Sequence, residues 1–219
     1  MKKILHVLNI NDFFPELFEL TYPTIKAYAD RTGFEINLIT QRKFPDYPIN
    51  YEKMQVYEDG EGADYNLLCD ADMLIHPHFP DVQSIVKPEN VAFNDNYNIS
   101  HKYYADRIKY FVRDGRDVGI ATNFVVTSSL THDLWEPLPL TQKEIAGLAI
   151  PNDREPDEWN RGWGHYADEF ALSFNLAKYG MKYQGICPED WQRPYLIHVG
   201  TGDTEKSLRI AKETLKQWA

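Results

Sequence analysis

Cysteine is scarce in this chain, which has only two in 219 residues: Cys69 in an apolar run and Cys187 before a proline. A small secreted protein held together by disulfides has more cysteines at regular spacing. The chain is also long enough to bury a core without such cross-links. We therefore expect two reduced thiols and an intracellular protein.

Long hydrophobic runs are also missing. No stretch approaches the roughly 20 apolar residues that a membrane-spanning helix needs. The apolar run near the N-terminus is interrupted at His6 and ends at Asn9, which is too short for the core of a signal peptide. These absences favour a soluble, cytoplasmic protein.

Basic residues are outnumbered: 23 Lys and Arg against 33 Asp and Glu give a net charge of −10. General binding to nucleic acids or to anionic membranes needs a basic surface, so the composition argues against both. A protein this acidic can still bind an anionic ligand if a local cation offsets the charge. No glycine-rich phosphate loop follows the first apolar run, which counts against a nucleotidyltransferase, an enzyme class that usually has such a loop near its first strand.

What the sequence does contain is an alternation of strand and helix patterns, typical of a parallel α/β sheet. The C-terminal segment is amphipathic, with Leu208, Ala211, Leu215 and Trp218 on one stripe. We found no repeat or linker, and therefore expect one domain over 1–219. Strands are expected at 4–10, 34–40, 65–69, 91–94, 119–127 and 195–199, and helices at 16–32, 51–58, 142–148, 168–179 and 205–218.

Polar residues follow several of these strands, and ligands of open α/β sheets bind beyond the carboxyl ends of the strands. Asp70 and Asp72 come directly after the third strand. Two carboxylates there would repel each other, and a divalent cation would relieve that repulsion. A solvated turn is the alternative.

A second polar group follows the late strand, where His198 precedes two glycines and a lysine at the start of the last helix. Imidazole can complete a carboxylate site for Mn²⁺. A helix N-terminus with a lysine favours an anion such as phosphate. A packed histidine and a surface lysine are the alternative for this segment.

Taken in order, these motifs resemble the GT-A fold nucleotide-sugar glycosyltransferases, in particular the glycogenin-like and galactosyltransferase branch and its small bacterial or virus-encoded members. The resemblance covers about residues 4–206. It rests on the Asp-x-Asp after the third strand and the late His-x-Gly…Lys. It is extended by four segments: 15–29 (PELFELTYPTIKAYA), 51–57 (YEKMQVY), 121–128 (ATNFVVTS) and 163–172 (WGHYADEFAL).

The resemblance implies a GT-A-type, Rossmann-like mixed sheet, mostly parallel and flanked by helices. Residues 1–95 would form the nucleotide-binding half, and residues 96–219 the acceptor-side half. The implied activity is the metal-dependent transfer of a sugar from a nucleoside diphosphate, with UDP favoured, to a hydroxyl acceptor, with a glycan favoured. Retention of the anomeric configuration is mildly favoured.

The resemblance also implies roles for individual residues. Asp70, Asp72 and His198 would hold Mn²⁺ or Mg²⁺, and Asp70 would also meet the donor. Asn9 and Asn11 would lie near the base and ribose, and Lys206 near the diphosphate. Asp168 or Glu169 would deprotonate the acceptor or stabilise an oxocarbenium-like centre, although both also fit ordinary acids in a first helical turn.

Three alternatives remain open from the sequence. A nucleotidyltransferase could use the same metal pair. A dehalogenase-type phosphatase also uses Asp-x-Asp, but it needs the motif at the first strand, with Thr or Val where this chain has Leu74. A nucleotide- or sugar-binding module without catalysis is the third.

Overall fold

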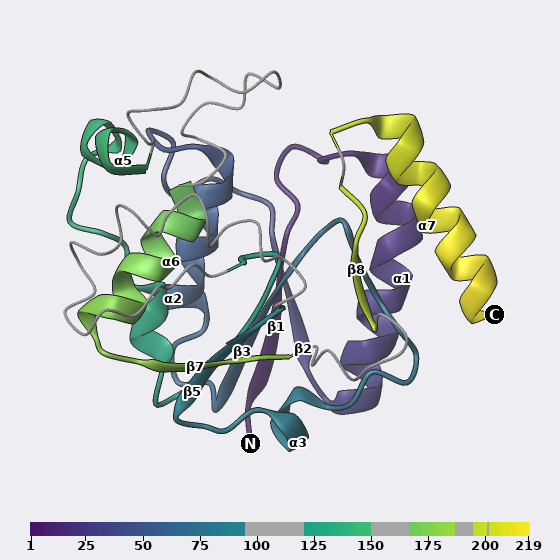
Figure 1. Ribbon diagram of the computed structural model, residues 1–219, viewed down its shortest axis with the longest axis horizontal. Helices are drawn as coiled ribbons and strands as arrows, with labels where there is room; N and C mark the ends of the chain where they lie inside the picture. Colours follow the sequence, from purple (N-terminus) through teal and green to yellow (C-terminus); the bar gives the residue numbers. More distant parts are fainter. Residues whose placement is uncertain (95–120, 150–166, 187–194, 201) are drawn as a thin grey trace.

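The computed structural model describes residues 1–94, 121–149, 167–186, 195–200 and 202–219. A six-stranded sheet lies between two groups of helices (Figure 1). Across the sheet the strands are β2 (Glu35–Ile39), β1 (Lys3–Leu8), β3 (Tyr65–Asp70), β6 (Phe124–Ser128), β5 (Asn90–Phe93) and β7 (Lys182–Gly185).

The strand directions make the sheet mixed but mostly parallel. β1 runs parallel to β2 and β3, and β5 runs parallel to β7. β6 runs antiparallel to both of its neighbours, β3 and β5. The expected α/β class with a mostly parallel sheet and flanking helices is confirmed.

Helices cover both faces of the sheet. On one side α1 (Pro15–Thr32) and α7 (Thr204–Trp218) lie side by side (Figure 1). On the other side α6 (Ala167–Lys178) packs against η1 (Ile49–Gln55), η2 (His132–Trp135) and α5 (Gln142–Ala149). The remaining short helices are α2 (Val56–Asp59) and α3 (Val82–Ile85).

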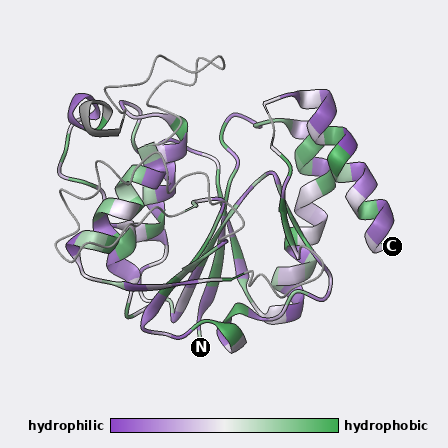
Figure 2. Ribbon diagram, in the orientation of Figure 1, coloured by the Kyte–Doolittle hydropathy of each residue, from purple (hydrophilic) through white to green (hydrophobic). Residues whose placement is uncertain are grey.

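The apolar strands supply both cores because neighbouring side chains point to opposite faces. In β3, Leu67 packs in the cluster that contains Ile25 of α1, whereas Leu68 packs in the cluster that contains Phe170 of α6. A strand covered on both faces is largely apolar, and Figure 2 shows hydrophobic stretches along the central strands of the sheet.

Helix α1 continues through Pro23, which lies inside it. It ends at Gly33, which has a φ of 76° and whose N–H donates to the carbonyl of Ala29. That left-handed conformation suits glycine. The helix begins at Pro15, shortly after the carboxyl end of β1.

The late strand expected at 195–199 is present as β8 (Leu196–His198). It lies outside the main sheet and pairs antiparallel with β4 (Met73–Ile75), a strand that the sequence did not predict. β7 was also missed, because its sequence KYQG has no apolar alternation and is mostly exposed. The strand expected at 119–127 begins only at Phe124 in the described part of the chain.

None of the helices in the described parts of the chain is both long and apolar enough to cross a membrane.

A buried histidine stabilises the centre of the sheet. His6 of β1 is fully buried, with Nε2 3.0 Å from Asn66 Oδ1 and Nδ1 3.1 Å from Asn37 Nδ2. A neutral ring with its proton on Nε2 can donate to Asn66 and accept from Asn37. Burial lowers the pKa of His6 to about 4, because the charged ring would lose its hydration.

This burial predicts an acid-sensitive fold. The unfolded chain takes up a proton at His6 as pH falls below 6.5, whereas the folded chain does so only near pH 4. The free energy of unfolding is therefore highest above pH 6.5, and it falls as pH decreases towards 4. His6 accounts for about 3 kcal/mol of this decrease. Urea unfolding of the wild type and of His6→Gln between pH 7 and pH 4 measures this loss, which should be absent from the variant. The same pH dependence in both proteins would contradict the assignment.

Candidate metal centre and surrounding site

The Asp70–Asp72 segment is held at the carboxyl end of β3 by its backbone. The N–H of Asp70 donates to the carbonyl of Asn123 at 2.9 Å. The hydroxyl of Thr21 in α1 donates to the carbonyl of Ala71 at 2.5 Å, and the N–H of Val199 donates to the carbonyl of Asp72 at 3.0 Å. Three different parts of the chain thus fix the direction of the two carboxylates.

The small β4–β8 sheet brings His198 to this segment. Met73 follows Asp72 directly, and in the antiparallel register Met73 pairs with His198. His198 Nε2 consequently lies 3.1 Å from Asp72 Oδ2. The structure therefore brings together the three residues that we expected as metal ligands.

These three side chains form a compact group. Ligating atoms from Asp70, Asp72 and His198 all lie within 4.8 Å of one another. All three are partly buried, with 21%, 13% and 20% of their side chains exposed. A group this close can reach one ion.

Burial and neighbouring charges shift the pKa values of all three side chains. Burial and the nearby carboxylate of Asp72 raise the pKa of Asp70, although Lys53 opposes the rise. Burial also disfavours the Asp72 carboxylate, but the imidazole of His198 outweighs it and lowers the pKa of Asp72. Burial disfavours the charged form of His198, but the attraction of the Asp72 carboxylate outweighs burial and raises the pKa of His198. A cation would relieve the repulsion between the two carboxylates.

The donor set fits a divalent ion. Two carboxylates and one imidazole suit Mn²⁺ well, and the oxygens suit Mg²⁺. Gly200 supports this fit, because a Cβ added there would lie 2.0 Å from Asp72 Oδ2 and 3.3 Å from His198 Nε2. The absence of a side chain at this position leaves room for the two ligands.

Lys53 lies next to this group and is buried, with 4% of its side chain exposed. Its Nζ is 2.7 Å from Asp70 Oδ1, 2.9 Å from Asp168 Oδ2 and 3.1 Å from the carbonyl of Thr122. Burial alone would lower the pKa of Lys53, but the carboxylates of Asp168 and Asp70 outweigh burial and raise it. The lysine is therefore a permanent cation between the partly buried carboxylate of Asp70 and the buried carboxylate of Asp168.

Asp168 is also buried, in the first turn of α6, with 4% of its side chain exposed. Besides Lys53, it accepts from the Thr122 hydroxyl at 2.6 Å and from Asn50 Nδ2 at 2.7 Å. Glu169 follows in the same turn and is partly buried. Of these two predicted residues, Asp168 is the one linked to the Asp70 carboxylate through Lys53.

Asn9 and Asn11 line a polar cavity of about 450 Å³ at the carboxyl ends of β1 and β2. The side chain of Asn9 is buried, and its Oδ1 has no hydrogen-bond partner within the described part of the chain. Asn11 and Asp12 have φ angles of 59° and 48°, a left-handed conformation that asparagine and aspartate adopt more readily than other non-glycine residues. The rest of the wall is formed by Ile10, Asp12, Thr40, Gln41 and Arg42.

Lys206 lies in the exposed first turn of α7. Its backbone N–H donates to the side chain of Asp203, which caps the helix. The last helix therefore begins shortly after the His198–Gly200 segment, as the sequence suggested.

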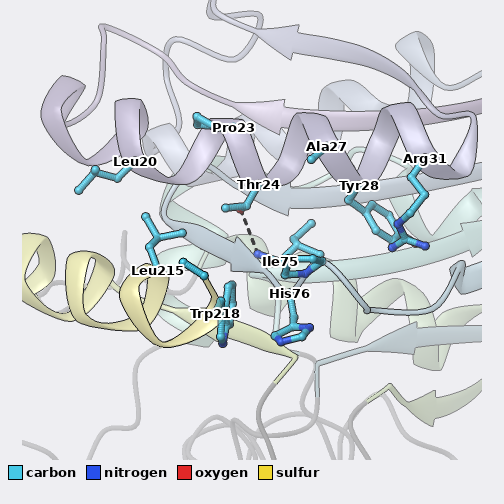
Figure 3. Close-up of a pocket in the computed structure, with 12 residues that line it drawn as sticks. Leu20, Pro23, Thr24, Ala27, Tyr28, Arg31, Ile75, His76, Leu215 and Trp218 are labelled. Atoms are coloured by element: carbon cyan, nitrogen blue, oxygen red, sulfur yellow. Dashed lines mark hydrogen bonds between the residues drawn. The ribbon is translucent and has the colours of Figure 1, made fainter.

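A different hollow lies away from the carboxylates, between α1, the end of β4 and the last turns of α7 (Figure 3). It measures about 530 Å³ and its walls are mostly apolar, with Leu20, Leu215 and Trp218 among them. Thr24 reaches across to the backbone N–H of Ile75 at 3.1 Å, the bond drawn in Figure 3. Among the described residues that line this hollow there is no Asp or Glu, so it lacks the carboxylates that a divalent ion needs, and the candidate metal centre is the group around Asp70.

The sequence did not single out Lys53, Thr122 or Asn50, and it pointed to Gly200 only as one of the two glycines that follow His198. Lys53 and Thr122 lie in segments quoted for the resemblance, yet neither received a role. The available signal was a lysine in a short predicted helix, close to two large apolar residues, Tyr51 and Met54, which the structure buries. The positions 163–166, which precede Asp168, lie outside the described residues.

Sequence comparison finds no counterpart, since no protein-family model matches the chain and no curated protein matches it. Solved structures do match. The galactosyltransferase LgtC, in complex with donor and acceptor sugar analogs, shares 10% identity with a TM-score of 0.52 over 95% of both chains. A glycosyltransferase involved in glycosylation of the major capsid of PBCV-1 shares 10% identity over 95% of this chain and 99% of that one, with a TM-score of 0.49.

A third similar structure is Drosophila β1,4-galactosyltransferase 7 in complex with manganese, UDP-Gal and xylobiose. It shares 13% identity over 92% of this chain and 72% of that one, with a TM-score of 0.47. At such low identities the likeness concerns the fold. The chain has the GT-A fold that its motifs suggested, the fold of the galactosyltransferase LgtC.

Proposed function

We propose that the protein is a metal-dependent glycosyltransferase that moves a sugar from a nucleoside diphosphate to a hydroxyl acceptor. The observation that carries this proposal is the cluster of Asp70, Asp72 and His198 at the carboxyl end of β3. This edge of the sheet is where open α/β sheets bind ligands. The GT-A fold adds support, because the fold is that of LgtC.

In this function Asp70, Asp72 and His198 would hold Mn²⁺ or Mg²⁺. The bound ion would supply positive charge that stabilises the departing nucleoside diphosphate. A chain with a net charge of −10 needs such a local cation to admit an anionic donor. Lys206, at the start of α7, would add a second positive charge towards the diphosphate.

The polar cavity at the ends of β1 and β2 would take the nucleoside. The buried Asn9 Oδ1 would accept an N–H of the base, which would satisfy a polar atom that otherwise costs stability. Asn11 would face the ribose. UDP is the nucleotide that the resemblance implies, and a UDP-sugar is therefore the donor that we propose.

Asp168 would act by its charge rather than as a proton acceptor. Its oxygens already accept hydrogen bonds from Lys53, Thr122 and Asn50, so both are engaged as acceptors in the structure. A fixed negative charge can stabilise an oxocarbenium-like sugar centre. Glu169 remains the candidate for deprotonating the acceptor hydroxyl.

The finer features of the proposal rest on the resemblance. They are a nucleotide-binding half over 1–95, an acceptor-side half over 96–219, a glycan acceptor and retention of the anomeric configuration. NMR of the anomeric proton of the product would distinguish retention from inversion.

The first prediction concerns metal-dependent nucleotide binding. Calorimetric titration of UDP, GDP and CDP with Mn²⁺ should show binding of one nucleotide, UDP, and EDTA should abolish it. Asp72→Ala removes one ligand of the ion and should weaken this binding at least about 100-fold. Asp30→Ala is the matched control, since Asp30 is an exposed aspartate in α1 that pairs with Lys26.

No binding of any of these nucleotides in the presence of Mn²⁺ would overturn the proposal. Metal-dependent binding without sugar transfer to any acceptor would favour the non-catalytic binding module. Release of inorganic phosphate from a phosphomonoester would favour the phosphatase.

A second prediction concerns Gly200. Gly200→Ala should weaken Mn²⁺ binding about tenfold or more, because the new methyl group forces Asp72 away from His198. Gly62→Ala controls for general destabilisation: Gly62 has a φ of 69° but open space around it, so its Mn²⁺ affinity should stay unchanged. Mn²⁺ affinities from electron paramagnetic resonance, with melting temperatures of both variants, check this. Equal affinity in Gly200→Ala and the wild type would contradict the site geometry.

A third prediction separates the two acids of α6. Asp168→Asn keeps the size of the side chain but removes its charge, so donor binding should persist while turnover falls about 100-fold. Glu169→Gln should also spare donor binding, and should change the pH dependence of turnover if Glu169 is the base. Unimpaired turnover in Asp168→Asn would remove Asp168 from the mechanism.

A further inference from the structure

The ammonium group of Lys53 has its hydrogen bonds committed. Asp70 Oδ1, Asp168 Oδ2 and the Thr122 carbonyl lie within 3.1 Å of Nζ, and a lysine has three protons to donate. The side chain is 4% exposed, so water screens this charge little. Lys53 is therefore a fixed positive charge rather than a flexible surface lysine.

This arrangement affects any cation that shares Asp70. Lys53 already engages Oδ1 of Asp70, so Oδ2 is the more available oxygen for an ion held with Asp72 and His198. The ammonium group and the ion would then lie on the two sides of one carboxylate. Like charges at such short range repel strongly in a poorly screened site.

We propose that Lys53 is a positioning residue that fixes Asp70 as a one-oxygen ligand and opposes the charge of the ion, so that the free protein holds a divalent cation weakly and a nucleoside diphosphate completes the site. This inference rests on the proposed function. The negative diphosphate offsets the repulsion, which makes retention of the ion depend on the presence of nucleotide.

Two effects of removing Lys53 act in opposite directions. Loss of the hydrogen bond frees the Asp70 side chain, which weakens ion binding. Loss of the positive charge strengthens ion binding. Asp70 has a short side chain, and its backbone N–H is held by the carbonyl of Asn123. The added freedom of its carboxylate therefore weakens ion binding little, and the electrostatic effect is the larger one.

The test compares variants in one background. Removing Lys53 alone would leave Asp168 buried without its cation, which can unfold a protein. Asp168→Asn is therefore the reference, and Lys53→Met and Lys53→Gln are each added to it. Gln can still donate to Asp70, so the Gln variant removes the charge while keeping a donor, whereas the Met variant removes both.

Mn²⁺ affinity is measured by electron paramagnetic resonance of the free ion, without nucleotide and with saturating UDP, on variants whose circular dichroism is that of the reference. Both double variants should bind Mn²⁺ about tenfold more tightly than the reference without UDP. The factor by which UDP improves Mn²⁺ affinity should fall correspondingly, since ion and nucleotide are thermodynamically coupled.

Mn²⁺ affinity that is unchanged or weaker in both folded double variants would overturn the role of Lys53 while leaving the proposed function intact. Tighter binding in the Gln variant alone would support the opposing charge and show that the donor to Asp70 matters as well. If the wild type binds no Mn²⁺ with or without UDP, the proposed function fails, and this inference fails with it.

Discussion

The buried ammonium group of Lys53 joins segments that lie far apart in the sequence. It pairs with Asp70 at the end of β3 and with Asp168 at the start of α6, and it contacts Thr122 just before β6. Separating a buried ion pair leaves an uncompensated charge, at a cost of about 3–5 kcal/mol. The position of α6 relative to the sheet edge, and with it the shape of the candidate site, depends on this pairing.

Several carboxylates that repel one another lie around Lys53. Asp70, Asp72 and Asp168 lie close together in a chain that is acidic overall. The lysine and the imidazole of His198 offset part of this charge. What remains suits a divalent cation, and this imbalance is the physical basis of the function that we propose. This group keeps a surplus of negative charge at the carboxyl end of β3.

Much of the fold was accessible from the sequence because the apolar patterns are strong. The runs around Leu5 and Leu67 are apolar on both faces, which is typical of central parallel strands, and Gly33 marks the end of α1. β4 and β7 were missed because one is too short and the other too polar to show periodicity. The antiparallel direction of β6 was equally hidden, since strand direction depends on the connections between strands and not on side-chain pattern.

For the site, the sequence by itself determined which chemical groups are available. They are two aspartates separated by one residue at the end of a buried strand, a histidine at the end of a late strand, and an excess of acidic charge. Those features depend on residue type and local spacing, which the chain carries directly. Only the tertiary structure decided that His198 reaches Asp72 through the β4–β8 pairing, that Gly200 leaves room for both, and that Lys53 connects Asp70 to Asp168. These contacts join residues far apart in the chain, and they form only when hydrophobic burial on both faces of the sheet brings the separate segments together.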